Sequence, residues 1–381
     1  MICPNFDDKQ TIVETKRLYF IDTIRAFAIL MMLQGHFIDT LLATQHRDTT
    51  NMGYITWQYF RGITAPVFFT ISGLIFTYLL LKAKDKGTLS LRIRKGLIRG
   101  FMLIGIGYSL RIPIFRWLTG SFGTYFLVID VLQCIGISLL LIVCIYLLAQ
   151  KNTLVFSIGM FCIATVLFLC EPLYRAYAAE GIPLFFANYL TKANGSVFTI
   201  IPWFGYMAYG SFVSTLFYRY GILPKFKTMT VASLFIVGSV LLFFSTDLLL
   251  WLFSVVDYWL FFEVANYNYL FIRLGNVLLI FGLFYSLESY TKHPVILKIG
   301  QKTLSIYVVH FIVLYGSFTG LGLNRILGKS LTFLEAFFGA IFFLVIVSFI
   351  SIHYTKIMTP FYLFIKEKAN HLKMLVPFLK K

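Results

Sequence analysis

The feature that most constrains the fold is a series of long apolar segments, which recur from Leu18 to Tyr354. Each is roughly 18 or more residues long, which is enough for a helix to cross the hydrocarbon core of a bilayer. Transmembrane β-strands would instead appear as alternating segments of about ten residues. Hydrophobic residues make up 59% of the chain and charged residues 13%, a composition outside the range of soluble domains. The sequence therefore predicts an all-α, polytopic membrane helix bundle.

About ten transmembrane helices are expected, at residues 18–42, 55–81, 96–118, 124–149, 153–172, 196–220, 229–252, 269–290, 303–320 and 331–355. The segment 247–268 is apolar but interrupted by acidic residues and asparagines, a pattern typical of an interfacial or re-entrant helix. We expect one membrane domain over 18–355, preceded by a polar segment, 1–17. It is followed by a basic amphipathic tail, 356–381, that lies on the inner leaflet.

The net charge of +17 reflects basic residues that cluster between the apolar segments, which favours anionic lipid headgroups over nucleic acid as their partner. Most lysines and arginines outside the expected spans fall on the side of the N-terminus, so both termini are predicted to be cytoplasmic. The five cysteines have neither CxxC spacing nor a paired extracytoplasmic framework, and no metal site is indicated.

The first apolar segment contains ionisable residues that are costly to place in lipid. His36 follows Arg25 by eleven positions, about three helical turns, so both lie on one face, about 16 Å apart along the axis. Asp22 and Asp39 fall on the same side, within an arc of roughly 100°. Such a stripe must face protein or water, and by default it indicates a functional site.

Other expected spans also contain a pair of polar residues on one helical face, three positions apart. These pairs are Arg61 and Thr64, Asp130 and Gln133, Arg273 and Asn276, and Tyr307 and His310. One such pair can hold two helices together. Together with Asp22 and Arg25 of the first span there are five pairs, three of which contain arginine, and they predict a polar, hydrated cavity. Asp130 is also a candidate ion-pair partner for Arg61, and Asp22 for Arg25.

The arginines suggest an anionic ligand, because a guanidinium group binds phosphate through two parallel hydrogen bonds. The basic stretch from Lys82 to Arg99 would form a cytoplasmic mouth for a phosphorylated cofactor. His36 is then the candidate general base, and Asp39 would orient its imidazole. Proton relay and a purely structural role are the alternatives for His36.

Several motifs resemble those of the transmembrane acyltransferase superfamily: Arg25 and His36 with ten residues between them, Phe68-Phe69-Thr-Ile-Ser72-Gly73, and the stretch from Gly300 to His310. The stretches from Arg17 to Arg25 and from Asp130 to Gly136 most resemble the heparan-alpha-glucosaminide N-acetyltransferase-like branch. This resemblance implies transfer of an acetyl group from cytoplasmic acetyl-CoA to an amino or hydroxyl group of an extracytoplasmic sugar. A bacterial inner membrane, with an envelope glycan as acceptor, is the expected setting.

The resemblance implies two different bases. His36 matches the catalytic histidine of bacterial sugar O-acyltransferases, whereas the heparan enzymes have their active histidine in the loop after the first helix, where this chain has His46. We favour His36. The residues assigned to the donor are Arg25, Arg61, Ser72, Tyr307 and His310. Those assigned to the acceptor are Arg47, Arg111, Asp130 and Gln133.

A transporter or flippase for an anionic lipid-linked sugar is the rival interpretation, and a structural membrane subunit ranks last. An inverted pair of broken helices would favour transport, and the sequence shows no such pair. The acceptor glycan, N- versus O-acetylation, the length of the acyl group, an acetyl-histidine intermediate and formation of a homodimer are all left open.

Overall fold

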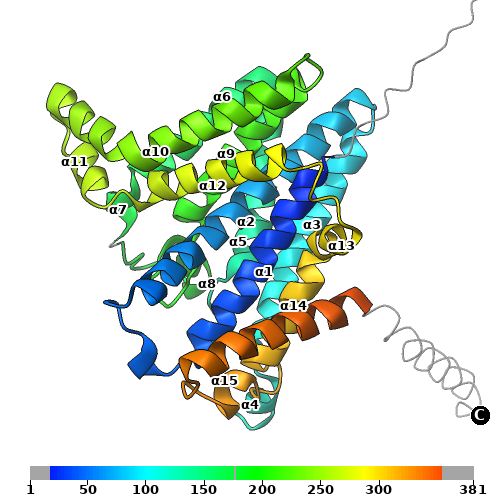
Figure 1. Cartoon of the computed structure of the whole chain (residues 1–381), viewed down its shortest axis with the longest axis vertical. Helices are drawn as coiled ribbons and strands as arrows, with labels where there is room; N and C mark the ends of the chain where they lie inside the picture. The colour runs from blue at the N-terminus through cyan, green and yellow to red at the C-terminus, as the bar shows by residue number, and fades with distance from the viewer. Residues whose placement is uncertain (1–17, 176, 354–381) are drawn as a thin grey trace, which may run out of the picture.

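The computed structural model describes residues 18–175 and 177–353 (Figure 1). This part of the chain is helical and has no strand, apart from a single bridge between Leu42 and Leu331. The all-α prediction is therefore confirmed. The predicted segments 1–17 and 356–381 lie outside the described residues.

The helices in chain order are α1 (Tyr19–Leu41), α2 (Met52–Asp85), α3 (Leu89–Arg111), α4 (Ile114–Leu118), α5 (Val131–Leu148), α6 (Thr153–Leu169), α7 (Glu171–Arg175), α8 (Leu184–Leu190), α9 (Ile200–Tyr220), α10 (Phe226–Val256), α11 (Trp259–Asn266), α12 (Tyr269–Ser286), α13 (Pro294–Gln301), α14 (Thr303–Tyr315), α15 (Leu323–Ile326) and a last helix, Phe333–His353. Two 3₁₀ turns, η1 (Thr44–His46) and η2 (Thr124–Leu127), lie in loops.

Six of these helices are long and apolar enough to cross a membrane, and the pair α13–α14, bent by 71°, would add a seventh. The chain is therefore a multi-pass membrane protein. Each of the ten predicted spans overlaps a helix, but the number ten and the cytoplasmic side of the termini stay predictions. The interrupted segment near residue 260 contains the separate short helix α11.

Two predicted spans end earlier than expected, each for a local reason. α3 stops at Arg111, because Pro113 disfavours a helical conformation in the residue before it. α14 stops at Tyr315, because Gly316 adopts a left-handed conformation with φ of 68°, which glycine tolerates. The polypeptide between these helix ends and the next elements forms loops beside the site described below.

Glycines allow the central helices to pack closely. α2 lies against α9, where a Cβ atom on Gly73 would overlap the carbonyl oxygen of Met207. α3 and α5 meet at Gly100 and Gly136, where a Cβ atom on Gly136 would lie 2.7 Å from the Gly100 oxygen. Small residues of this kind are typical of helix interfaces in membranes. The result is a tight bundle of α1, α2, α3, α5 and α9 (Figure 1).

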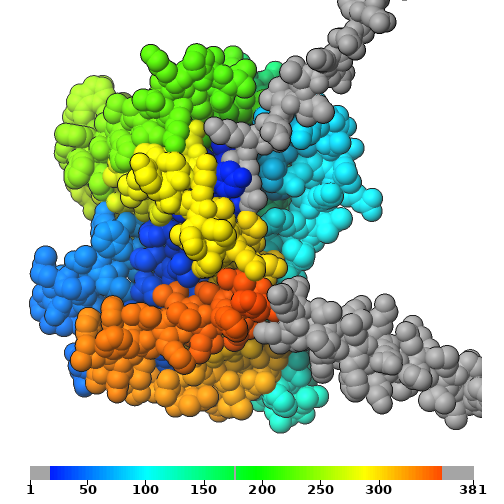
Figure 2. All heavy atoms as spheres, turned by 45° about the vertical axis from the view of Figure 1, so that its right-hand side comes forward, coloured from blue at the N-terminus to red at the C-terminus, as the bar shows by residue number. Residues whose placement is uncertain are grey.

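The outer helices present large apolar side chains outward. Phe243 and Trp251 on α10 are exposed, as are Phe338 and Phe342 on the last helix. Figure 2 shows the last helix and the preceding loop forming one end of the molecule, beneath α12 and α13. Exposed apolar surface of this extent suits contact with lipid.

Candidate active site

Two cavities lie at different levels of the bundle, and α1, α2, α3 and α14 line both of them. Residues of α5 line the first cavity, whereas only its N-cap residue, Asp130, reaches the second. On α1, Arg25 lines the first cavity, whereas His36 and Asp39 line the second. On α14, Tyr307 lines the first cavity and Tyr315 the second. We call the first the arginine cavity and the second the wide cavity.

The arginine cavity has a volume of about 80 Å³ and apolar walls from α2, α3 and α5. Its polar lining residues are Arg25, Ser72, Arg92, Arg99, Thr303 and Tyr307. Arg25 Nη2 donates to Thr303 Oγ1 at 2.8 Å, and Arg25 Nη1 lies 3.6 Å from Asp22 Oδ1. No aspartate or glutamate of the described chain lines this cavity, and Arg92 Nε is buried there without a hydrogen-bond partner. The cavity is therefore suited to an anionic ligand.

The wide cavity has a volume of about 1130 Å³. Its charged or strongly polar lining residues are His36, Asp39, Arg61, Arg111, Arg116, Ser121, Asp130, Ser317, Asn324 and Arg325. Ser317 Oγ and Asn324 Oδ1 are buried without hydrogen-bond partners among the described residues. Its size and its unpaired polar atoms suit a large ligand with many hydroxyl groups.

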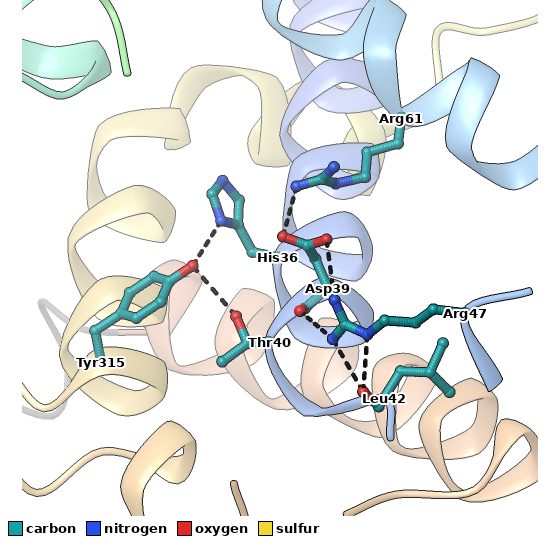
Figure 3. Close-up of polar contacts among 7 residues, drawn as sticks. All are labelled: His36, Asp39, Thr40, Leu42, Arg47, Arg61 and Tyr315. Atoms are coloured by element: carbon teal, nitrogen blue, oxygen red, sulfur yellow. Dashed lines mark hydrogen bonds and ion pairs between the residues drawn. The ribbon is translucent and has the colours of Figure 1, made fainter. Parts of the chain in front are cut away.

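His36 is held by a hydrogen bond to α14. Its Nδ1 lies 2.8 Å from Tyr315 Oη, and Thr40 Oγ1 lies 3.4 Å from the same Oη (Figure 3). The Tyr315 hydroxyl is able to accept a hydrogen bond from Nδ1–H while it donates to Thr40. In that arrangement Nε2 of His36 carries the free lone pair that a general base needs.

The Asp39 carboxylate, predicted to orient His36, is instead engaged with arginines (Figure 3). Its Oδ2 lies 2.7 Å from Arg61 Nη2, and its Oδ1 lies 3.9 Å from Arg47 Nη1. Arg47 Nη2 also donates to the Asp39 and Leu42 carbonyl oxygens, at 2.7 and 2.9 Å. Asp39 therefore ties α1 to α2 and to the loop that follows α1.

Asp130 pairs with Arg111 rather than with Arg61, the partner that its sequence position suggests. Arg111 Nη2 lies 2.9 Å from Asp130 Oδ2. Asp130 also caps α5, since its Oδ1 accepts from Val131 N at 2.9 Å and Gln133 Oε1 accepts from Asp130 N at 3.3 Å. Close packing of α3 on α5 brings the Arg111 and Asp130 charges together, and Arg61 pairs with Asp39 instead.

The remaining predicted site residues occupy other positions. Arg61, assigned to the donor from sequence, lines the wide cavity, and Arg47 lines neither cavity. Gln133 is fully buried next to Gly107, and its Nε2 has no partner in the described structure. His310 is also fully buried and lines neither cavity. His46 lies in η1, outside both cavities, with a buried and unpartnered Nε2.

Sequence reasoning missed Thr303 and Tyr315, which bond to Arg25 and His36. A signal for them exists, because Thr303, Tyr307, Phe311 and Tyr315 recur every four residues and form one stripe on α14. The site predicted from sequence includes only the middle of that stripe, through the Tyr307–His310 pair. The contact of its ends with α1 depends on the tertiary structure.

A family model for the heparan-alpha-glucosaminide N-acetyltransferase catalytic region matches residues 17–256, well over half of the chain. The chain belongs to this family. The match includes His36, Arg61, Arg111 and Asp130, whereas α14 lies beyond it. A search of curated proteins found no match. This heparan-alpha-glucosaminide N-acetyltransferase family member is thus a multi-pass membrane protein with the catalytic region of an acetyltransferase, as the sequence motifs predict.

Proposed function

We propose that the chain transfers an acetyl group from acetyl-CoA, bound at the arginine cavity, to an amino or hydroxyl group of a sugar in the wide cavity. The observation that supports this most directly is the pairing of two chemically different cavities that are both lined by α1, α2, α3 and α14. One is lined by three arginines and by no acidic residue of the described chain, and the other by a histidine. A membrane enzyme with donor and acceptor on opposite sides needs such an arrangement.

The donor substrate suits the arginine cavity by charge. Arg25, Arg92 and Arg99 would bind its phosphates, and the unpartnered Nε of Arg92 is available for one of these bonds. Ser72, Thr303 and Tyr307 would contact the acyl-bearing end. A cavity of about 80 Å³ holds only a part of so large a molecule.

His36 would act as the base toward the acceptor. Donation from Nδ1 to Tyr315 would fix the tautomer in which Nε2 accepts a proton. The hydroxyl or neutral amino group of the acceptor would supply that proton. Arg111, Asp130 and Arg61 line the same cavity and would hold the sugar. Asp39 would act by fixing Arg61 rather than by touching the imidazole.

The orientation we propose puts the arginine cavity on the cytoplasmic side. Its Arg92 and Arg99 belong to the first half of α3, which follows the lysine-rich end of α2 at Lys82, Lys84 and Lys86. Basic residues of this kind mark cytoplasmic ends of membrane helices. The wide cavity would then face the extracytoplasmic side of a bacterial plasma membrane.

The test is acetyl transfer by the purified chain in proteoliposomes, with radiolabelled acetyl-CoA on one side and glucosamine or a glucosamine oligosaccharide on the other. His36→Ala should lower the rate by about 10²- to 10⁴-fold, the usual contribution of a general base. Tyr315→Phe should lower it less, since the imidazole stays in place. His293→Ala is the matched control, because His293 is exposed and lies outside both cavities.

His46→Ala separates the two candidate bases. Full activity in His36→Ala together with loss of activity in His46→Ala would move the base to the loop. Movement of the sugar across the membrane without consumption of acetyl-CoA would replace the acetyltransferase proposal with a transporter.

A further inference from the structure

His310 is a buried histidine for which the chemistry above provides no role. It is fully buried, and neither ring nitrogen makes a well-formed hydrogen bond with the described residues, although the backbone carbonyl groups of Ile306 and Tyr307 lie near the ring. A buried polar atom without a well-formed hydrogen bond is destabilising, so two such atoms on one ring call for an explanation. A ligand that supplies the missing bonds is one explanation.

The position of His310 indicates which part of a ligand would reach it. Its ring centroid lies 4.9 Å from that of Tyr307, which lines the arginine cavity, and 5.4 Å from that of His36, which lines the wide cavity. On α14 it lies between Tyr307 and Phe311, the residues where one cavity ends and the other begins. The reacting carbonyl group must pass this level if donor and acceptor bind as proposed.

Gln133 provides a second sign that this level is polar. It follows Asp130 of the wide cavity by three residues and is next to Leu132 of the arginine cavity, and its Nε2 is buried without a partner in the described structure. Both α5 and α14 thus carry a buried side chain with unused hydrogen-bonding atoms at the boundary of the two cavities.

We propose that His310 donates a hydrogen bond to the carbonyl oxygen of the acyl donor and stabilises the negative charge that forms on it. None of the ion pairs in the described structure involves His310. The neutral ring therefore avoids an unpaired buried charge, and a neutral imidazole has one N–H to donate. This assignment rests on the proposed acetyl transfer and adds a catalytic residue to it.

The acceptor nitrogen or oxygen bonds to the carbonyl carbon and gives its proton to His36, while the carbonyl electron pair moves to the oxygen. His310 hydrogen-bonds that oxygen and keeps its own proton. When the pair returns, the carbon–sulfur bond breaks, and the sulfur leaves with the proton from His36. The products are the acetylated sugar and a free thiol.

The first measurement is kinetic, on the full chain in proteoliposomes. His310→Leu should lower kcat by about 10²- to 10³-fold with little change in KM, as expected when one donor to a developing oxyanion is lost. His310→Gln keeps an N–H donor and should recover part of the loss. His353→Leu is the matched control, because that histidine is half-buried at the end of the last helix and lines neither cavity.

The second measurement does not depend on turnover. Hydrogen bonding lowers the carbonyl stretching frequency, so isotope-edited infrared spectra of bound [1-¹³C]acetyl-CoA should shift to lower frequency in wild type and less in His310→Leu. If His310→Leu does not fold, His310→Phe, which also lacks an N–H donor, provides the same comparison. Unchanged kcat or an unchanged carbonyl frequency in the variant without the donor would overturn the role of His310. Loss of transfer in wild type would instead overturn the proposed function.

Discussion

Asp130 performs two separable tasks, so its replacement by asparagine and by alanine should give different losses of stability. One carboxylate oxygen caps α5 and the other pairs with Arg111 at 2.9 Å. Asparagine keeps an oxygen for the cap but removes the charge, whereas alanine removes both. The Arg111 side chain is only 9% exposed, so its charge would stay buried and unpaired in either variant.

The magnitudes follow from these two contacts. Loss of one partner of a buried ion pair costs about 3–5 kcal/mol. We expect the lower end, because the pair borders the wide cavity and the Arg111 guanidinium also lies over the Tyr125 and Phe311 rings, at 5.1 and 5.8 Å. Asp130→Asn should therefore cost about 3 kcal/mol. Asp130→Ala should cost about 1 kcal/mol more, the usual value of an N-cap.

The assay is unfolding of the purified chain in one detergent, by temperature and by denaturant. Asn152→Ala is the matched control, because Asn152 caps α6 by accepting from Leu154 N and Val155 N and its side chain carries no charge. It should lose only the cap, about 1 kcal/mol. Arg111→Met combined with Asp130→Asn should be more stable than Asp130→Asn alone, because no unpaired charge remains.

Equal stability of Asp130→Asn and wild type would refute this reasoning, since it would mean that water in the cavity screens the charge completely. A double variant that is less stable than Asp130→Asn would refute it too. In that case Arg111 would contribute through packing rather than through its pair with Asp130.

Two further predictions concern helix packing and the donor cavity. Gly73→Ala should lower the yield of folded protein and the thermal midpoint of unfolding, because its methyl group would overlap Met207. Gly105→Ala should leave both unchanged, since nothing lies within 4 Å of the added atom, and equal midpoints for the two variants would contradict this reasoning. Arg92→Met should raise KM for acetyl-CoA by about 10-fold or more at nearly constant kcat, as expected for the loss of a charged hydrogen bond. Arg94→Met on the exposed side of the same helix is its control, and an equal KM for both would contradict the assignment.

The sequence was sufficient to predict the helices and the residues that share a face. Spacing along one helix placed Arg25 and His36 on a common stripe, and the structure assigns them to different cavities because about 16 Å of axis separates them. Family motifs in the sequence predict the heparan-alpha-glucosaminide N-acetyltransferase-like branch, and the family match confirms this prediction. Both kinds of inference use local information.

Pairing between helices was not predictable in the same way. Spacing cannot show that α3 reaches α5 closely enough for Arg111 to meet Asp130, because this depends on the Gly100–Gly136 contact. It also cannot show that Asp39 turns toward Arg61, which leaves Tyr315 as the partner of His36. Such partners follow from the depth and rotation of whole helices, which one sequence does not reveal.

The difference in volume between the two cavities bears on the fate of an activated acyl group. A space of about 80 Å³ with apolar walls has room for only a few water molecules. A thioester bound there, as proposed above, would be shielded from hydrolysis, the side reaction that would otherwise consume it. The larger cavity has room for solvent, so preference for the sugar over water would depend on how well the boundary between the two cavities, near Tyr307 and His310, excludes water.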